Sequence, residues 1–336
     1  MNNLKIAALL AVLLSCIGCA QFLNLNGSVN ESKAIKATEG LKFVRSLPLP
    51  EKEFVNKLIL EKRFDEFEEL SIKYDDEFKK NPLYESQLYK LYDAVDSLPE
   101  LEEPLKEWVK NKPSYMSYCA LGSFYTYRGY VLRGEKYARD TPKESLRKMR
   151  ELHALAKLYL RKSIEDNNLF VPAYCQLISA EKSSGSIGEI DRIHNKAIEL
   201  VPESYYVRAM YLNAIVPKWG GSYDKMSLYL QSINYDQLSN PRIWSLQGMV
   251  DREKGYSAYS HEKYLQSIDF YNKSLIYGDG MYVYLWRSYS YWKVNNLKES
   301  LADLRKYLEY DKNNKKVQRR IRYLSSKLAA SSPKAK

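Results

Sequence analysis

Two stretches near the C-terminus repeat one pattern of large and small side chains, and this pattern constrains the fold more than any other feature. The markers of the first stretch and their counterparts 33 positions later are Tyr264, Ser267, Tyr271 and Ser274, and Leu297, Ser300, Leu304 and Tyr307. A second set recurs after 34 positions as Ala156, Leu160 and Ser163, and Ile190, His194 and Ala197. Spacings of three and four residues place such markers on one face of a helix. The sequence therefore predicts helices that recur about every 34 residues.

Three of these four helices follow another helix in which small residues stand beside large ones. The markers of the preceding helices are Leu121, Gly122 and Tyr125, then Trp244 and Gly248, then Tyr284, Ser288 and Tyr291. Small residues are needed where two helices cross closely. This pattern and period resemble the tetratricopeptide repeat. We therefore expect an all-α fold, an irregular tetratricopeptide-like helix-pair solenoid with a C-terminal capping helix.

The composition agrees with a helical chain that lacks a metal site. Its 336 residues include 30 tyrosines but only 14 glycines, 12 prolines and three histidines. Few chain breakers and no long Val/Ile runs favour helices over sheets. Cys119 and Cys175 have no zinc-like spacing and form either a disulfide or two buried thiols. We expect no metal and no cofactor.

The first residues have the features of a bacterial export signal. Lys5 supplies a short positive segment, and the apolar stretch at 4–14 is too short to span a membrane. An apolar residue lies three positions before Cys16, and a glycine lies directly before Cys19, so both resemble a lipobox cysteine. In bacterial lipoproteins this cysteine is diacylated and becomes the N-terminus, and we prefer Cys16. The absence of Asp after either cysteine resembles the outer-membrane class, so we expect a lipid anchor on the periplasmic side of that membrane.

Changes in composition divide the chain into segments. We expect a lipoprotein signal peptide and lipobox at 1–18, a flexible tether at 19–50, a helical domain at 51–235, tetratricopeptide-like repeats at 236–314, a capping helix at 315–330 and a disordered tail at 331–336.

The predicted capping helix is strongly basic. One apolar stripe runs along it, formed by Val317, Ile321, Leu324 and Leu328. From Asp303 onward eleven basic residues stand against three acidic ones, so +8 of the formal charge of +11 lies here. Nucleic acid is the usual partner of such a patch, but an exported protein does not meet it, so we expect no nucleic acid. The patch is either a solvated face or a contact for anionic lipid or an acidic partner.

Residues 63–226 carry a second resemblance. Its markers include Trp108, Gly122, Tyr125, Tyr130, Arg133 and the run Pro217-Lys218-Trp219-Gly220-Gly221-Ser222. Together they resemble a bacterial domain family of unknown function with a Pro-Arg-Trp-Gly-Gly-Ser signature, often joined to helical repeats. Lys218 stands where the family has Arg, which replaces a two-pronged donor by a point charge.

The run from 217 to 222 is also a candidate site. Proline ends the preceding helix, two glycines permit a tight turn, and Ser222 or Asp224 caps the next helix. It is either a tight interhelical corner or a pocket for an anion or carboxylate. The candidate binding residues are Arg133, Lys218, Trp219, Gly220, Gly221 and Ser222.

We find no arrangement typical of catalysis and predict that the protein is not an enzyme. The paired acids are Asp65/Glu66, Glu68/Glu69, Asp75/Asp76 and Glu102/Glu103. Helix neighbours diverge by about 100°, so we expect these pairs on solvated faces. Ser222 lacks the Gly-x-Ser-x-Gly context of a nucleophile. His153 and His194 lie on amphipathic helices, and we expect packing roles for both.

Tyrosine is concentrated at 115–130 and 282–291. We expect Tyr127, Tyr282 and Tyr289 to line a binding surface, because tyrosine offers apolar area and a hydroxyl at low entropic cost. The sequence thus predicts a non-catalytic envelope lipoprotein, a helical-repeat scaffold that binds a protein or peptide partner. The alternative is an envelope enzyme or a small-anion-binding protein that uses the corner at 217–222.

Overall fold

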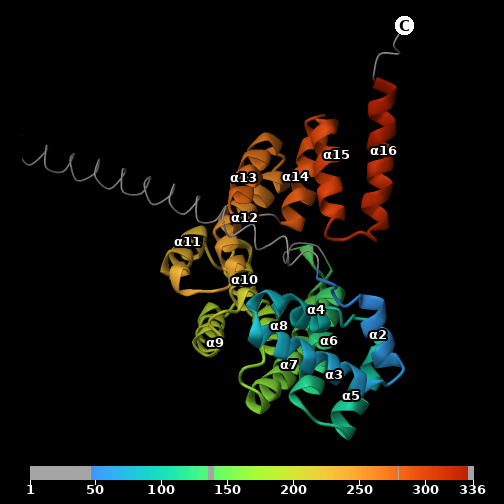
Figure 1. Cartoon of the computed structure of the whole chain (residues 1–336), viewed down its shortest axis with the longest axis vertical. Coiled ribbons are helices and arrows are strands. Elements are labelled where there is room, and N and C mark those ends of the chain that lie inside the picture. The colour runs from blue at the N-terminus through green and yellow to red at the C-terminus, as the bar shows by residue number, and fades with distance from the viewer. Residues whose placement is uncertain (1–46, 135–139, 279, 332–336) are drawn as a thin grey trace, which may run out of the picture. The chain divides into compact units, whose positions relative to one another are not determined.

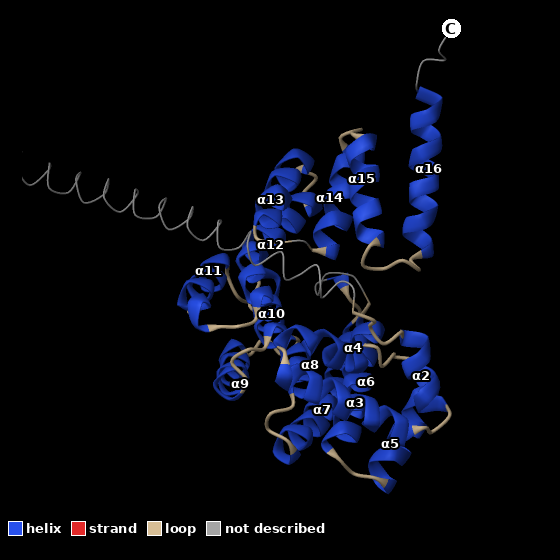
Figure 2. Cartoon of the chain, in the orientation of Figure 1, coloured by secondary structure: helices blue, strands red, loops and turns tan. Residues whose placement is uncertain are grey.

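The computed structural model describes residues 47–134, 140–278 and 280–331. Fifteen α-helices follow one another in these ranges without a strand, which confirms the all-α class (Figure 2). None of these helices is long and apolar enough to cross a bilayer. The predicted signal peptide with Cys16 and Cys19, most of the tether, and the tail after Ser331 lie outside the described residues.

The chain forms two compact units, which meet in sequence between Glu253 and Lys254. The helices of the N-terminal unit are α2 (Lys52–Leu60), α3 (Phe64–Lys80), α4 (Glu85–Asp93), α5 (Glu102–Asn111), α6 (Tyr115–Arg133), α7 (Lys143–Asp166), α8 (Val171–Lys182), α9 (Ile187–Leu200), α10 (Tyr205–Ala214) and α11 (Tyr223–Ser232). The helices of the C-terminal unit are α13 (Tyr264–Ile276), α14 (Met281–Lys293), α15 (Leu297–Leu308) and α16 (Lys315–Ser331). The boundary falls within α12 (Met249–Ser260), whereas the sequence analysis began the repeats at residue 236.

In the N-terminal unit, α6 and α7 form the tightest helix pair. A methyl group added at Gly122 would lie 2.6 Å from Cγ of Leu160, and one added at Gly129 would lie 2.5 Å from the His153 ring. The two helices approach this closely because glycine has no side chain at these positions. Gly122 and Leu160 thus have the packing roles that the repeat pattern predicts.

First helices of successive pairs form a row, and α4 lies across it. Helix α8 contacts both α6 and α10, and α4 contacts all three (Figure 1). Tyr89 of α4 stacks on Tyr206 of α10 with ring centroids 3.9 Å apart. Asp93, at the other end of α4, accepts a hydrogen bond from Tyr127 of α6. Helix α4 therefore covers the face of the N-terminal unit that α6, α8 and α10 form.

In the C-terminal unit, one contact recurs at the predicted offset. The Ser267 hydroxyl donates to the carbonyl of Gly255 at 2.9 Å, and the Ser300 hydroxyl donates to the carbonyl of Ser288 at 2.8 Å. Donors and acceptors are each 33 residues apart. The repeat pattern predicted Gly248 as the small residue of the first pair, and this prediction is wrong. Gly248 is the last residue of a 3₁₀ helix (Pro241–Gly248), and the helix pair begins only with α12, so Gly248 lies outside the pair.

Helix α16 closes the C-terminal unit as the capping helix. It packs on α15 through its apolar stripe, in which Val317 and Leu324 are buried (Figure 1). A buried ion pair joins the two preceding helices. The Arg287 guanidinium of α14 donates to both carboxylate oxygens of Asp303 of α15 at 2.8 and 2.7 Å, and to the Asn272 side chain of α13 at 2.7 Å. One side chain thus connects three consecutive helices.

Candidate functional site

The run from 217 to 222 forms a tight corner between α10 and α11. The amides of Trp219 and Gly221 both donate to the carbonyl of Val216, at 3.0 and 3.2 Å. Gly220 has a φ of 92°, a left-handed conformation that favours glycine. The Ser222 hydroxyl then accepts from the amide of Lys225 at 3.0 Å, so Ser222 rather than Asp224 caps α11. The residues from 217 to 222 therefore determine the tight turn and the start of α11 themselves.

Three cations gather around Trp219, and we call this group with its turn the Trp219 corner. The Lys182 ammonium lies 5.0 Å from the centroid of the Trp219 ring and 5.2 Å from that of Tyr130. The Arg133 guanidinium lies 5.5 Å from the Trp219 centroid. Burial, followed by the charges of Lys218 and Arg133, lowers the pKa of Lys182 to about 8. The corner is thus a positively charged site with aromatic walls.

One carboxylate faces these cations. Glu253 lies 3.8 Å from the ammonium of Lys218 and 3.5 Å from the guanidinium of Arg252. The structure thus brings together Arg133, Lys218 and Trp219, which the sequence singled out. Sequence reasoning missed Lys182, because no local pattern shows that the last residue of α8 reaches the corner.

The two adjacent glycines of this corner are required for different reasons: Gly220 for its left-handed backbone conformation, and Gly221 for close packing. An alanine methyl at Gly221 would lie 1.8 Å from the carbonyl oxygen of Ile215, while at Gly220 no atom lies within 4 Å. We expect Gly220→Ala to lower the free energy of unfolding by about 1–2 kcal/mol, the cost of a left-handed alanine. We expect Gly221→Ala to cost about 3 kcal/mol or more, because backbone must move. Urea unfolding measures both. Equal losses would contradict the close approach at Gly221.

The hydroxyl of Tyr127, one of the predicted binding tyrosines, is bonded inside the fold. It donates to Asp93 and accepts from the Gln176 amide at 3.1 Å. Asp93 also accepts from Tyr89 at 3.2 Å and from Lys90 at 2.6 Å. Burial, followed by the Asp93 charge, raises the pKa of Tyr127 well above its usual value. Tyr127 therefore fixes α4 against α6 and α8.

Aromatic side chains and a cation form a second candidate surface, in the C-terminal unit. Its members are half-exposed and come from three first helices; we call them the aromatic face: Tyr259 of α12, Trp286, Tyr289 and Trp292 of α14, and Arg320 of α16. The Trp286 centroid lies 5.2 Å from that of Tyr259 and 5.4 Å from that of Tyr289. The Arg320 guanidinium lies 4.5 Å from the Tyr289 ring centroid and 4.8 Å from that of Trp292.

The predicted binding tyrosines of α14 differ in their surroundings. Tyr289 belongs to the aromatic face, while Tyr282 is 59% exposed and lies seven residues earlier. Seven residues are two helical turns, so both start from the same side of α14. The structure thus keeps both as surface candidates, and it adds the two tryptophans and Arg320.

Two of the three histidines, His153 and His194, and several acids are buried inside the N-terminal unit. His153 donates through Nε2 to the carbonyl of Thr126 at 3.1 Å, and its Nδ1 lies 2.6 Å from the Ser183 hydroxyl. Burial lowers the pKa values of His153 and His194 to about 4. Glu68 was expected on a solvated face, but it is buried and accepts from Trp108 at 3.3 Å and Ser114 at 3.1 Å. The expectation failed because Trp108 of α5 and Ser114, which precedes α6, reach across to α3 and cover Glu68.

Cys119 and Cys175 are both buried free thiols, so the disulfide alternative does not hold. Burial raises the pKa of each thiol, which keeps both in the unreactive neutral form. No group of three His, Cys, Asp or Glu side chains suited to a metal ion occurs in the described ranges.

Glu85 caps α10 from inside the protein. Its carboxylate accepts from the Ser204 hydroxyl and from the amides of Tyr205 at 2.8 Å and Tyr206 at 3.2 Å. Burial raises the pKa of Glu85 from 4.5 to about 7, although these bonds and the Arg242 charge act in the opposite direction. The fold thus uses this acid to hold α4 on the start of α10.

The raised pKa of Glu85 predicts a pH dependence of stability. Between pH 4.5 and 7 the folded state holds a proton that the unfolded chain has released, so the free energy of unfolding falls as pH rises. Glu85→Gln cannot titrate, and we expect the wild type to lose on the order of 3 kcal/mol relative to it between pH 5 and 8. Urea unfolding of both proteins at both pH values measures this, and the comparison cancels the opposite effects of His153 and His194. Parallel pH profiles would contradict the prediction.

Comparison with protein-family models and with curated proteins finds no match to this chain. The geometry of the two candidate surfaces therefore carries the functional argument.

Proposed function

We propose that the protein is a non-catalytic, lipid-anchored scaffold of the bacterial envelope, and that its aromatic face binds an acidic segment of a protein or peptide partner. The observation that carries this is the cluster of half-exposed rings with a stacked cation on α12, α14 and α16. Aromatic residues and arginine dominate binding energy at protein interfaces.

The charge around the aromatic face supports an acidic partner. The Lys293 ammonium lies 5.6 Å from the ring centroid of Tyr264 and 5.7 Å from that of Trp292. Arg320 likewise rests on rings. A cation that lies on a ring is positioned without being neutralised, so it remains able to attract a carboxylate. A peptide that combines acidic and apolar residues fits both properties.

The N-terminal unit favours the same assignment by exclusion. In helical-repeat proteins the row of first helices offers an extended binding surface. Here α4 lies on that row and joins it through the bonds of Glu85, Tyr89 and Asp93. The comparable row in the C-terminal unit is the one that carries the aromatic face.

Two features support a role without catalysis. His153 and His194 are 1% and 3% exposed and bonded within the fold, which makes them unsuited to proton transfer with a substrate. Of the paired acids, Asp65 and Glu66 are exposed neighbours, with ion pairs to Lys112 and Arg63 respectively. Neither set places an acid and a base around a common point.

The lipid anchor predicts a specific mass for the mature protein. We expect cleavage before Cys16 and several acyl chains on that residue, because the export signal resembles a lipoprotein signal. Intact mass spectrometry of the membrane-extracted protein measures the cleavage site and acyl content together. Cys16→Ser should release the protein from the membrane, while Cys19→Ser serves as the matched control. A mature chain without acyl groups would contradict the proposed lipid anchor. Acylation of Cys19 instead of Cys16 would show that Cys19 is the anchored residue.

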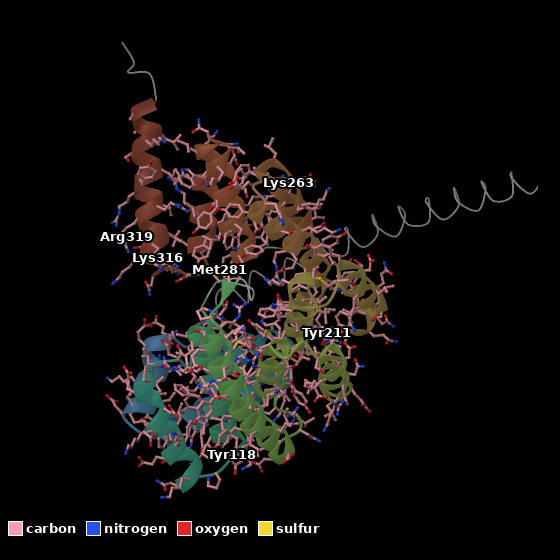
Figure 3. The ribbon with its side chains drawn as sticks, turned by 180° about the vertical axis from the view of Figure 1, so that it is seen from behind. Tyr118, Tyr211, Lys263, Met281, Lys316 and Arg319 are labelled. Carbon is pink, nitrogen blue, oxygen red and sulfur yellow. The ribbon has the colours of Figure 1, made fainter. Side chains whose placement is uncertain are left out.

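A charge reversal tests the aromatic face. We expect Arg320→Glu to weaken partner capture by the full-length protein about tenfold or more, the effect of reversing one interfacial charge. Arg319→Glu is the control: it makes the same change on the next residue, but Arg319 is exposed and points away from α15 (Figure 3).

Photo-crosslinking in the bacterial host measures the contact directly. A crosslinking amino acid at position 289 should trap one defined partner that position 323, exposed on α16, does not trap. Equal trapping at both positions, or an equal effect of the two arginine variants, would count against the aromatic face.

A further inference from the structure

Lys182 of the Trp219 corner has aromatic neighbours where a half-buried lysine usually has an acid. Its ammonium contacts the rings of Tyr130 and Trp219, and no ion pair of Lys182 occurs within the described ranges. The Tyr130 hydroxyl donates to the carbonyl of Ser179, so it is a neutral phenol and supplies no negative charge to the lysine. Within the described residues the amine therefore has no directly paired acid, and only the more distant charge of Glu253 acts in its favour.

The nearby acids already serve other cations. Glu181 precedes Lys182 in the chain, but it lies 3.2 Å from the ammonium of Lys157 and 2.9 Å from the guanidinium of Arg161. Glu253 divides its two oxygens between Lys218 and Arg252. Among the residues that the structure describes, Arg133, Lys182 and Lys218 lie near one carboxylate, that of Glu253, and the formal charge of these four residues is +2. Counting Arg252 makes the excess larger.

We propose that the Trp219 corner binds a doubly charged phosphate group, free or as a monoester, between Lys182, Arg133 and Lys218. A phosphate monoester carries a charge of about −1.5 to −2 at neutral pH, which matches the excess of +2. One carboxylate would neutralise only half of it. This site lies wholly within the N-terminal unit and is independent of the aromatic face.

The energetics of the corner agree with this assignment. Burial and the charges of Lys218 and Arg133 lower the pKa of Lys182 to about 8, although the charge of Glu253 acts in the opposite direction. The charged amine is therefore less stable at this site than in water, and a bound anion would stabilise it. Groups gathered against mutual repulsion at a surface are typical of binding sites. The tight turn at Gly220 and Gly221 holds the Trp219 ring that orients the cations, which gives the signature run a role beyond the turn itself.

Calorimetric titration of the full-length protein in detergent tests the proposal. The probes are inorganic phosphate, phenyl phosphate and benzoate. We expect saturable binding of both phosphates and weaker binding of benzoate. Tighter binding of phenyl phosphate than of inorganic phosphate identifies an ester as the ligand, because the phenyl ring then contacts Tyr130 or Trp219; equal affinities identify free phosphate. Absence of saturable phosphate binding, or benzoate binding that equals it, overturns the proposal.

Matched lysine variants distinguish a site from a general charge effect. Lys182→Gln should weaken phosphate binding about tenfold, the loss expected for one charge-assisted hydrogen bond. Lys73→Gln, which removes an exposed lysine of α3, should leave it within twofold. Lys182→Gln should also keep or raise the melting temperature, because it removes an uncompensated charge. Equal effects of the two variants on binding, or a lower melting temperature with unchanged binding, would overturn the assignment.

Discussion

The close crossing of paired helices at small residues is the constraint on which the rest of the structure depends. Gly122 lets α6 meet Leu160 of α7, and Gly255 of α12 lies against the Tyr271 ring of α13. The serine of the second helix then reaches the carbonyl of the first, as Ser267 does. Close approach at these small residues lets the two helices of a pair bury their apolar faces against each other. The next pair can then pack on the surface that the first pair forms.

The N-terminal unit departs from simple stacking because α4 lies on its row of first helices. Such a helix brings polar groups into the interior, and each needs a partner there. Glu85 meets the amides at the start of α10, and Asp93 meets Tyr127 and Lys90. These bonds convert a face that repeat proteins use for ligands into part of the core. Binding surfaces are therefore expected elsewhere, at the Trp219 corner of this unit and on the aromatic face of the C-terminal unit.

Local patterns in the sequence were sufficient for some features and not for others. The turn at 220–221 and a cap at Ser222 or Asp224 were predicted from adjacent residues, because their physical causes lie within a few positions, and the structure selects Ser222. Tyr127 could not be placed, since its partner Asp93 is 34 residues away on a helix outside the repeat pattern. Gly248 was predicted as the small residue, whereas Gly255 holds that position, because only the start of α12 shows which glycine lies in the helix pair. Lys182 gave no signal at all.

Glu181 and Lys182 show why charge in a sequence does not predict charge at a site. Neighbours on a helix point about 100° apart, so Glu181 pairs with Lys157 and Arg161 while Lys182 turns to the rings of Tyr130 and Trp219. Arg320 on the aromatic face is held by rings in the same way. Rings position a cation without neutralising it. Both surfaces therefore hold positively charged groups in fixed positions, which favours anionic ligands at each. Part of the chain's net charge of +11 is thus concentrated at these two surfaces.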